Sequence, residues 1–331
     1  RINQMKILIT GSSGFIGYHL SNKMILSKKN LVVGLDNLNN YYDLSLKKRR
    51  IKSTKNKSKK NFFFIKTDIS NFTQLEKIFK KYKFDIVVNL AAQAGVRYSI
   101  TNPEAYVRSN LIGFFNILEL SKKYKIKHLV SASTSSVYGK IKRLPLKVSI
   151  PADEPIQFYA ATKRSNEIMG YSYSELYKMR ITMIRFFTVY GPWGRPDMSL
   201  FLFVKNILEN KKINVFNHGS HQRDFTHVYD IVEGIKLVIN KKKSKNIKKF
   251  NIINLCRGKK ITLMNFIKII EKYLNKKSKI RFMEMQKGDI ENTLGDLSET
   301  KKFIRFKPKI NFKDGVKSFV DWYKSYYLIK K

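Results

Sequence analysis

The chain has 331 residues, 43% of them hydrophobic, which is enough for one large domain or two modest ones and excludes a chain too polar to bury a core. Lys and Arg number 66 against 24 Asp and Glu, giving a formal net charge of +42 that would draw anionic substrates to the protein at low salt. The single cysteine excludes an internal disulfide and a cysteine zinc cluster, and it fits a cytoplasmic protein. The sequence has no run of roughly 18 apolar residues, the length that a membrane helix needs, so we expect no membrane partner.

Short apolar runs alternate with helical patterns through the first half of the chain. The runs predict buried strands over 6–10, 31–35, 62–66, 84–89 and 128–132. Apolar residues three and four apart predict helices between them over 15–27, 71–80 and 103–122, and Pro103 suits a first helical turn. This alternation predicts an α/β fold, a Rossmann-type doubly wound parallel sheet.

Two lysine-rich runs, Lys47 to Lys60 and Lys241 to Lys249, fall between the periodic segments, where solvated loops are the usual outcome for charge. Elsewhere lysines are scattered and accompany abundant Asn, Ile, Phe and Tyr, as a coding bias would give. Because no binding stripe emerges, we expect no nucleic-acid partner.

The pattern changes from about Ile181, where Pro192-Trp-Gly-Arg-Pro196 precedes mixed short elements and an amphipathic stretch from Phe312 to Tyr326. This change predicts a second, smaller mixed α/β domain. We expect the larger domain to span 1–185 with a returning segment at about 225–256, and the smaller one to span 186–224 and 257–331.

A glycine-rich turn, Gly11-Ser-Ser-Gly14-Phe15-Ile16-Gly17, follows the first predicted strand and opens the first predicted helix. Glycines let the backbone turn tightly and approach a pyrophosphate, whose charge then meets the dipole-positive start of the helix. The spacing differs from GxGxxG, and glycines in a turn are often only structural. The position after a strand nevertheless favours a dinucleotide site.

Asp36, 25 residues beyond Gly11, ends the second predicted strand, and it and the following Asn37 are candidate cofactor-binding residues. A carboxylate there can accept hydrogen bonds from both ribose hydroxyls and repel a 2′-phosphate. The sequence therefore predicts NAD rather than NADP as cofactor, with a simple turn residue as the alternative role for Asp36.

Tyr159 and Lys163 stand four residues apart at the start of a predicted helix, so both side chains lie on one helical face. For Tyr159 to act as a base, its pKa must fall from about 10 by about three units, roughly 4 kcal/mol, which a neighbouring ammonium and an oxidised nicotinamide ring could supply. This spacing is common by chance in a chain with 18 tyrosines. A catalytic role for the pair is supported by Thr134, because hydroxyls after the fifth strand lie where a doubly wound sheet places its active site.

Longer motifs refine this interpretation. They are Asp36-Asn-Leu-Asn-Asn-Tyr-Tyr-Asp43, Ala91-Ala-Gln93-Ala-Gly-Val-Arg97-Tyr-Ser99, Arg185-Phe-Phe-Thr188-Val-Tyr-Gly-Pro-Trp-Gly-Arg195-Pro-Asp-Met198 and Gln222-Arg223-Asp-Phe-Thr226. With them the sequence resembles the extended short-chain dehydrogenase/reductase family over nearly its whole length, and within that family the UDP-glucuronate 4-epimerases. The resemblance implies a homodimer formed through the helices that begin near Pro103 and Tyr159.

The resemblance also assigns roles to residues. Thr134, Tyr159 and Lys163 are implied to be catalytic. The adenine and ribose sides of the cofactor are implied to contact Asp68, Ile69, Leu90, Ala91, Ala92 and Asn110. The uridine diphosphate is implied to lie against Val215, Phe216, Arg223 and Asp289. The sugar and its carboxylate are implied to contact Gln93, Arg97, Ser135, Ser136, Thr188 and Arg195. No metal site is expected.

The reaction expected from the resemblance is the C4 epimerisation of UDP-glucuronate to UDP-galacturonate, by tyrosine-mediated oxidation to a 4-keto sugar and re-reduction. An epimerase of neutral or N-acetylated UDP-hexoses and a UDP-glucuronate decarboxylase remain open on the same scaffold. A 4,6-dehydratase is disfavoured, because such relatives carry an Asp-Glu pair where this chain has Ser135 and Ser136. The alternative outside enzymes is an NAD-containing protein that binds anions or nucleic acid through its charge.

Overall fold

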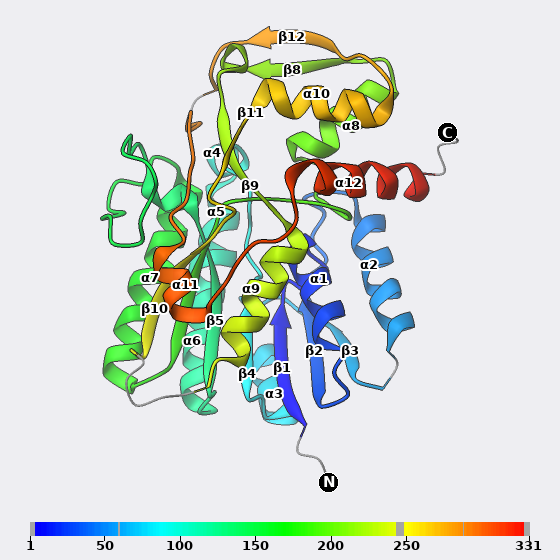
Figure 1. The fold of residues 1–331 in the computed structure, drawn as a ribbon. Helices are drawn as coiled ribbons and strands as arrows, with labels where there is room; N and C mark the ends of the chain where they lie inside the picture. Colours follow the sequence, from blue (N-terminus) through cyan, green and yellow to red (C-terminus); the bar gives the residue numbers. More distant parts are fainter. Residues whose placement is uncertain (1–3, 59, 243–247, 287, 328–331) are drawn as a thin grey trace.

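The computed structural model describes residues 4–58, 60–242, 248–286 and 288–327 (Figure 1). Its largest sheet has seven strands, all parallel. In sheet order they are β10 (Phe250–Leu255), β6 (Ile181–Phe186), β5 (His128–Thr134), β4 (Ile86–Asn89), β1 (Met5–Thr10), β2 (Asn30–Asp36) and β3 (Phe62–Lys66). The predicted doubly wound α/β fold is confirmed, and so is each strand that the sequence predicted.

Helices cover both faces of this sheet (Figure 1). One face carries α1 (Phe15–Met24), with α2 (Leu44–Lys57) beside it, and also α9 (Val228–Asn240) and α11 (Ser298–Ile304). The other face carries α3 (Phe72–Tyr82), α6 (Gly113–Lys123) and α7 (Phe158–Tyr177). Within the described ranges, none of the helices is long and apolar enough to span a membrane.

The alternation of side chains along β1 explains the two layers. Ile7 and Ile9 lie in the core beneath α1 and α9, whereas Leu8 lies in the core beneath α3 and α6. Successive side chains of a strand point to opposite faces, so a strand covered on both sides is apolar throughout. All three residues are fully buried.

The carboxyl ends of the parallel strands lie at the edge of the sheet that faces the smaller sheets (Figure 1). At this edge β1 is flanked by β2 on one side and β4 on the other. The strand order reverses there, which is where doubly wound sheets bind ligands.

The remaining strands form two small sheets. One contains β11 (Lys260–Thr262), β9 (Gln222–His227) and β7 (Thr188–Tyr190), and the other pairs β12 (Lys279–Met283) with β8 (Lys212–Phe216). They share a core with α8 (Ser199–Leu208), α10 (Leu263–Leu274) and α12 (Phe312–Tyr326). The smaller mixed region is therefore confirmed, and α12 coincides with the predicted amphipathic stretch. The domain boundaries at 185, 224 and 256 stay a prediction.

The lysine-rich run that begins at Lys47 is not a solvated loop, so that prediction was wrong. Residues 44–57 form α2, and the Asp43 carboxylate caps it by accepting the Ser45 backbone N–H at 2.8 Å. Lys47 is 5% exposed and Arg50 is fully buried. The charge pattern misled because these two cations point inward on a helix whose other cations face solvent. Most of the second run, 243–247, lies outside the described residues.

The helix predicted over 103–122 is interrupted. After α4 (Tyr98–Thr101) the chain forms α5 (Pro103–Tyr106), a π-helical segment η1 (Val107–Ile112), and then α6. A π-helix frees backbone groups from the regular helical pattern. The Asn110 carbonyl accepts the side-chain amide of Asn166 in α7 at 2.7 Å. The interruption thus joins this segment to the helix that carries Tyr159 and Lys163.

Three buried histidines are expected to make the fold sensitive to acid. Burial lowers the pKa of His19 and His128 to about 3, and that of His227 to about 4, from 6.5. Below pH 6.5 the unfolded chain therefore binds more protons than the folded protein. The stabilisation is complete above that pH, and each histidine removes about 1.4 kcal/mol per pH unit from the free energy of unfolding as the pH falls further.

We therefore expect the midpoint of thermal unfolding to fall between about pH 7 and about pH 5. His128→Asn should reduce that fall, because the unfolded variant no longer gains a proton at this position. Calorimetry of both proteins at the two pH values checks the expectation. A wild-type midpoint that stays constant over this range would contradict it.

Candidate active site

A cavity of about 450 Å³ opens at the carboxyl ends of the large sheet. The predicted site residues that line it are Gly11, Gly14, Phe15, Ile16, Gly17, Asp36, Asn37, Asp68, Ile69, Leu90, Ala91, Ala92, Gln93, Thr134, Ser135, Ser136, Tyr159, Lys163, Thr188 and Arg195. Those that do not line it are Asn110, Arg97, Val215, Phe216, Arg223 and Asp289. Apart from Asn110, the residues expected for the cofactor and for catalysis therefore meet in one space.

The glycine turn needs its glycines for steric reasons. Gly11 has a φ of +67°, and a Cβ there would lie 2.8 Å from the backbone nitrogen of Ala91. A Cβ on Gly17 would lie 2.1 Å from the Gly11 carbonyl oxygen. Gly14 is the N-cap of α1, and its N–H donates to the Gly11 carbonyl at 2.9 Å. The start of α1 thus offers bare backbone to the cavity, which fits the pyrophosphate of a dinucleotide.

Asp36 ends β2 at one end of the cavity, and it is 7% exposed. Its carboxylate accepts the backbone N–H of Ser13 at 3.2 Å and that of Leu38 at 2.9 Å. Burial raises the pKa of Asp36, while the ammonium of Lys47 opposes the shift. Lys47 also lines the cavity and donates to the Asn39 carbonyl at 2.8 Å. A carboxylate in this position fits contact with a ribose.

The next wall of the cavity follows β3 and β4. Asp68 accepts the side-chain amide of Asn37 at 2.9 Å, so these two predicted residues contact each other. The Ala91 backbone N–H donates to the Thr10 hydroxyl at 3.1 Å, and Thr10 donates to the Asn89 side chain at 2.7 Å. These bonds hold residues 90–92 against the end of β1, directly beside the glycine turn.

The predicted catalytic residues come from two elements that meet at the cavity. Thr134 ends β5, and its hydroxyl accepts the Ser136 backbone N–H at 3.2 Å at the start of the short helix η2 (Ser135–Tyr138). Tyr159 and Lys163 lie one turn apart near the start of α7, and Lys163 is 2% exposed. The arrangement brings a phenol, an ammonium and a hydroxyl to the same cavity wall.

Burial dominates the acid–base state of this group. Removal from water raises the pKa of Tyr159, whereas Arg195 and the Thr134 hydroxyl lower it. Burial lowers the pKa of Lys163 to about 8, and Glu167 opposes that shift. Arg195 is thus a cation that favours the phenolate, a role that the sequence did not suggest for it. A phenolate near neutral pH needs further positive charge beside it, which fits an oxidised nicotinamide in the cavity.

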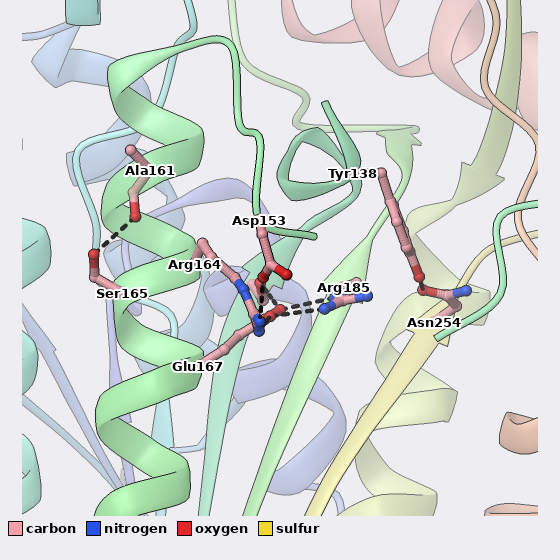
Figure 2. A network of polar contacts seen from close by, with 9 residues as sticks. Tyr138, Asp153, Ala161, Arg164, Ser165, Glu167, Arg185 and Asn254 are labelled. Atoms are coloured by element: carbon pink, nitrogen blue, oxygen red, sulfur yellow. Dashed lines mark hydrogen bonds and ion pairs between the residues drawn. The ribbon is translucent and has the colours of Figure 1, made fainter. Parts of the chain in front are cut away.

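A buried ion pair between Glu167 and Arg185, drawn in Figure 2, lies close in sequence to the predicted catalytic residues. Glu167 of α7 accepts two hydrogen bonds of 2.8 Å each from Arg185 of β6. It also accepts the Ser133 hydroxyl of β5 at 2.6 Å. Because Ser133 precedes Thr134 and Glu167 follows Lys163 by one helical turn, the ion pair fixes the spacing between the strand and the helix.

Small hydroxyls and one guanidinium line the far end of the cavity. Ser135, Ser136 and Thr188 supply the hydroxyls, and Arg195 supplies the guanidinium. Arg195 binds the Asp197 carboxylate through Nε at 3.0 Å and through Nη2 at 2.5 Å. Burial disfavours the charged form, but Asp197 outweighs it and raises the pKa of Arg195. Arg195 therefore stays cationic, and these two bonds leave Nη1 for an anion in the cavity.

Asn110 lies behind the cavity wall. It is 2% exposed, and its side chain accepts the Gln93 backbone N–H at 2.8 Å. Its amide donates to the Gln93 carbonyl at 3.1 Å and to the Thr162 hydroxyl at 3.0 Å. In this structure Asn110 thus supports Gln93, which lines the cavity, instead of facing the cavity itself.

The five other predicted residues outside the lining come mainly from the smaller sheets. The Arg97 guanidinium lies 5.1 Å from the centre of the Phe216 ring, and its Nη2 lies 4.0 Å from the Asp289 carboxylate. Burial lowers the pKa of Arg223, and Asp289 opposes the shift. Val215 is fully buried in the core of the small sheets. The structure thus brings two cations, a ring and a carboxylate together, and it places Val215 beneath them.

Sequence reasoning missed several residues that line the cavity. Those with polar or long side chains include Asn39, Tyr41, Tyr42, Lys47 and Met198. The signal for four of them was present, because Asn39, Tyr41 and Tyr42 belong to the motif that begins at Asp36, and Met198 ends the motif that begins at Arg185. Lys47 was hidden in the lysine-rich run, where one inward lysine looks like its solvated neighbours.

Three comparisons with known proteins agree with this geometry. Residues 8–319 match the family model described as GDP-mannose 4,6 dehydratase. The chain is 46% identical over 336 residues to protein CapI of Staphylococcus aureus, covering 98% of this chain and 99% of that protein. It is 42% identical over 318 residues to UDP-glucuronate 4-epimerase of Thermodesulfobacterium geofontis, covering 96% and 95%. The solved structure of UDP-glucuronic acid 4-epimerase from Bacillus cereus, in complex with UDP-glucuronic acid and NAD, matches with a TM-score of 0.91 and 32% identity over 98% of this chain and 100% of that one.

Proposed function

The chain belongs to the extended short-chain dehydrogenase/reductase family, and from that premise we propose that it interconverts UDP-glucuronate and UDP-galacturonate by NAD-dependent epimerisation at C4. The observation that carries this proposal is the convergence of the glycine turn, the Tyr159–Lys163 pair and Arg195 on one cavity. The names of the similar proteins support the same substrate and cofactor.

Bound NAD supplies the acceptor, and later the donor, of the hydride at the sugar C4, so the net reaction is redox-neutral. The turn from Gly11 to Gly17 would hold its pyrophosphate, and Asp36 would hold the adenosine ribose. Lys163 would hold the nicotinamide ribose from the opposite side of the cavity. Residues 90–92 would pack along the cofactor between these points. The absence of side chains at Gly11 and Gly17 supports this fit.

Tyr159 acts as the base of the reaction. As the hydride leaves C4, the phenolate takes the proton of the 4-hydroxyl, and a 4-keto sugar results. The phenol gives the proton back when the hydride returns to the opposite face of the ketone, which inverts the centre. Thr134 hydrogen-bonds the reacting oxygen, and the positive charge of Arg195 favours the phenolate. Inversion requires the sugar to turn within the cavity between the two transfers.

Strong binding of the nucleotide lets the sugar turn without dissociating. Arg223 would bind the diphosphate, and Phe216 with Asp289 would contact the uridine. The separate position of this group beside the smaller sheets supports a division between a nucleotide site and a sugar site. We propose accordingly that the segments 186–224 and 257–331 bind the nucleotide sugar, and that 1–185 with 225–256 binds NAD.

The uronate carboxylate has to be held in place, because the 4-keto intermediate is a β-keto acid that loses carbon dioxide when its carboxylate bond aligns with the carbonyl. Arg195 would bind this carboxylate, and Ser135, Ser136 and Thr188 would fix its orientation. Gln93 and Arg97 complete the set proposed for the sugar. The position of the Arg195 guanidinium and of the three hydroxyls in the cavity lining supports this assignment.

Rival reactions differ in the groups that they require. A 4,6-dehydratase needs an acid beside Thr134 to eliminate the 6-hydroxyl, whereas Ser135 and Ser136 stand there. The acidic residues that line the cavity, Asp36 and Asp68, lie at its cofactor end. A neutral-sugar epimerase does not need Arg195. A decarboxylase would act on the same UDP-glucuronate, so the product separates it from a 4-epimerase.

Product analysis tests the proposal. The purified protein is incubated with UDP-glucuronate, without added cofactor, and the nucleotide sugars are separated by anion-exchange chromatography and identified by NMR. We expect UDP-galacturonate to appear, which also requires that NAD stays bound through purification. UDP-pentose as the main product would establish a decarboxylase. Turnover of UDP-glucose with none of UDP-glucuronate would establish a neutral-sugar epimerase.

Replacing Arg195 by alanine should weaken the selectivity for a uronate. We expect kcat/KM for UDP-glucuronate to fall by about 100-fold or more, since a charged hydrogen bond is worth about 1.5–3 kcal/mol and orientation adds to it. The pH optimum should move up, because Arg195 no longer lowers the pKa of Tyr159. NAD binding should change little. Equal losses in uronate turnover and NAD binding would argue against the role.

We also propose a homodimer that packs through α6 and α7. Large apolar side chains on these helices are exposed to solvent: Phe115 is 45% exposed, Ile168 56% and Leu176 68%. An apolar face of this kind favours association. Light scattering should give twice the chain mass of 38.9 kDa.

The one cysteine, Cys256, is buried and free, which supports a cytoplasmic location.

A further inference from the structure

Arg50 of α2 is a fully buried cation bound by oxygens of two separate loops. Its Nη1 donates to the Ser13 carbonyl at 2.9 Å and to the Tyr42 hydroxyl at 2.7 Å. Its Nη2 donates to the Trp193 carbonyl at 2.5 Å. Within the described part of the chain, Nε has no hydrogen-bond partner. Taking a guanidinium out of water is costly, and these hydrogen bonds offset that cost.

The two loops joined by Arg50 belong to the two ends of the cavity. Ser13 lies in the glycine turn, and residues 192–194 lead directly into Arg195. Three consecutive carbonyls of this second loop are held by side chains of α1 and α2. His19 donates to the Pro192 carbonyl at 2.8 Å, and Arg50 bonds the Trp193 carbonyl and reaches the Gly194 carbonyl at 3.5 Å. The backbone before Arg195 is thereby fixed to the elements that flank the glycine turn.

The conformation of this loop depends on its surroundings. Trp193 has a φ of +60°, which a residue with a side chain adopts only when its contacts enforce it. Its ring lies 5.5 Å from that of Trp322 and 5.2 Å from that of Tyr326 in α12, and 5.1 Å from that of Tyr18 in α1. Aromatic packing therefore covers the side chain, while Arg50 holds the backbone. Without Arg50, we expect the loop to relax.

We propose that Arg50 is a positioning residue that sets the place of Arg195 relative to the cofactor, and thereby the selectivity for a sugar carboxylate. This inference rests on the proposed role of Arg195. Arg195 is already paired with Asp197, and it lines the cavity in the loop position that Arg50 helps to hold. A shift of the loop moves the guanidinium away from the substrate without removing any group that touches it.

Arg50→Met tests the inference, since methionine fills part of the space but makes none of the bonds. The matched control is Lys48→Met, which removes the same charge from an exposed position of the same helix. Arg50→Lys keeps the buried charge but lacks the two guanidinium nitrogens that bond the two loops at the same time. Calorimetry gives the Kd values of UDP-glucuronate and of UDP, and product analysis gives the ratio of UDP-pentose to UDP-galacturonate.

We expect Arg50→Met to raise the Kd of UDP-glucuronate by about 10-fold while the Kd of UDP stays within about 2-fold, because misplacement of a binding group by about an ångström suffices for such a loss. The share of UDP-pentose should rise, since the carboxylate is held less firmly. Arg50→Lys should lie between, and Lys48→Met should match the wild type.

An unchanged Kd for UDP-glucuronate and an unchanged product ratio in Arg50→Met would overturn the inference. An equal rise in the Kd values of UDP and UDP-glucuronate would also overturn it, because a general loosening of the protein would affect both ligands alike. If Arg50→Met does not fold, the same two comparisons in Arg50→Lys decide. Failure of the proposed function itself looks different: the wild type would then bind UDP-glucuronate no more tightly than UDP, or would form no UDP-galacturonate.

Discussion

Tyr159→Phe should lower kcat by about 100- to 10,000-fold, the range measured when a general base is removed. The ring stays in place, so the cavity keeps its shape and the variant should still bind UDP-glucuronate and retain NAD. The loss arises because no other group accepts the 4-hydroxyl proton where the hydride leaves. Single-turnover kinetics, with NADH absorbance as the readout of the oxidation step, measures the effect.

The control is Tyr171→Phe, which deletes the same hydroxyl from a residue on the same helix that is 54% exposed and outside the cavity lining. It should keep wild-type activity. If Tyr159→Phe retained more than about a tenth of wild-type kcat, the phenol would not be the base, and the proton would have to leave by another route.

Gly17→Ala should abolish cofactor retention. The new Cβ would lie 2.1 Å from the Gly11 carbonyl oxygen and 2.8 Å from its carbonyl carbon, so the backbone of the glycine turn must move. A displacement of that size removes the N–H groups from the pyrophosphate, and we expect NAD to bind at least about 100-fold more weakly. The cofactor content of the purified protein, released by heat denaturation and quantified by chromatography, measures it.

Gly170→Ala provides the matched control, because this glycine also lies in a helix, α7. A Cβ there would meet its nearest atoms at 3.4–3.6 Å, which is ordinary contact. The substitution should leave the cofactor content unchanged and raise stability slightly, since glycine within a helix costs about 0.5–1 kcal/mol relative to alanine. Full cofactor content in Gly17→Ala would show that the turn does not contact the pyrophosphate as proposed.

Sequence alone predicts those parts of the cavity that follow from local pattern. The strands of the large sheet are short apolar runs, and the carboxyl ends of parallel strands meet at one edge, so Gly11, Asp36 and Thr134 had to lie near one another. The four-residue spacing of Tyr159 and Lys163 fixes a common helical face. These predictions need no knowledge of tertiary contacts beyond the topology of the fold.

The side-chain environments that sequence analysis did not predict depend on contacts between distant segments. Lys47 and Arg50 were predicted to be solvated, because the sequence does not distinguish a buried cation on a lysine-rich helix from its exposed neighbours. The side chain of Asn110 bonds Gln93 and its carbonyl accepts a bond from Asn166 of α7, which the sequence does not reveal; its contact with the cofactor stays a prediction. The pairing of Arg195 with Asp197 could be suspected from their spacing, but its effect on the cavity depends on the loop position that Arg50 helps to set.

The central claim is that one tyrosine and one retained NAD move a proton and a hydride to and from the same carbon. UDP-glucuronate that carries deuterium at C4, incubated with the protein in ordinary water, tests it directly by NMR and mass spectrometry of the product. We predict that UDP-galacturonate keeps the deuterium at C4, because the hydride returns to the carbon it left. Replacement of the deuterium by solvent hydrogen would contradict the account, since it would mean that C4 is inverted by proton exchange with water.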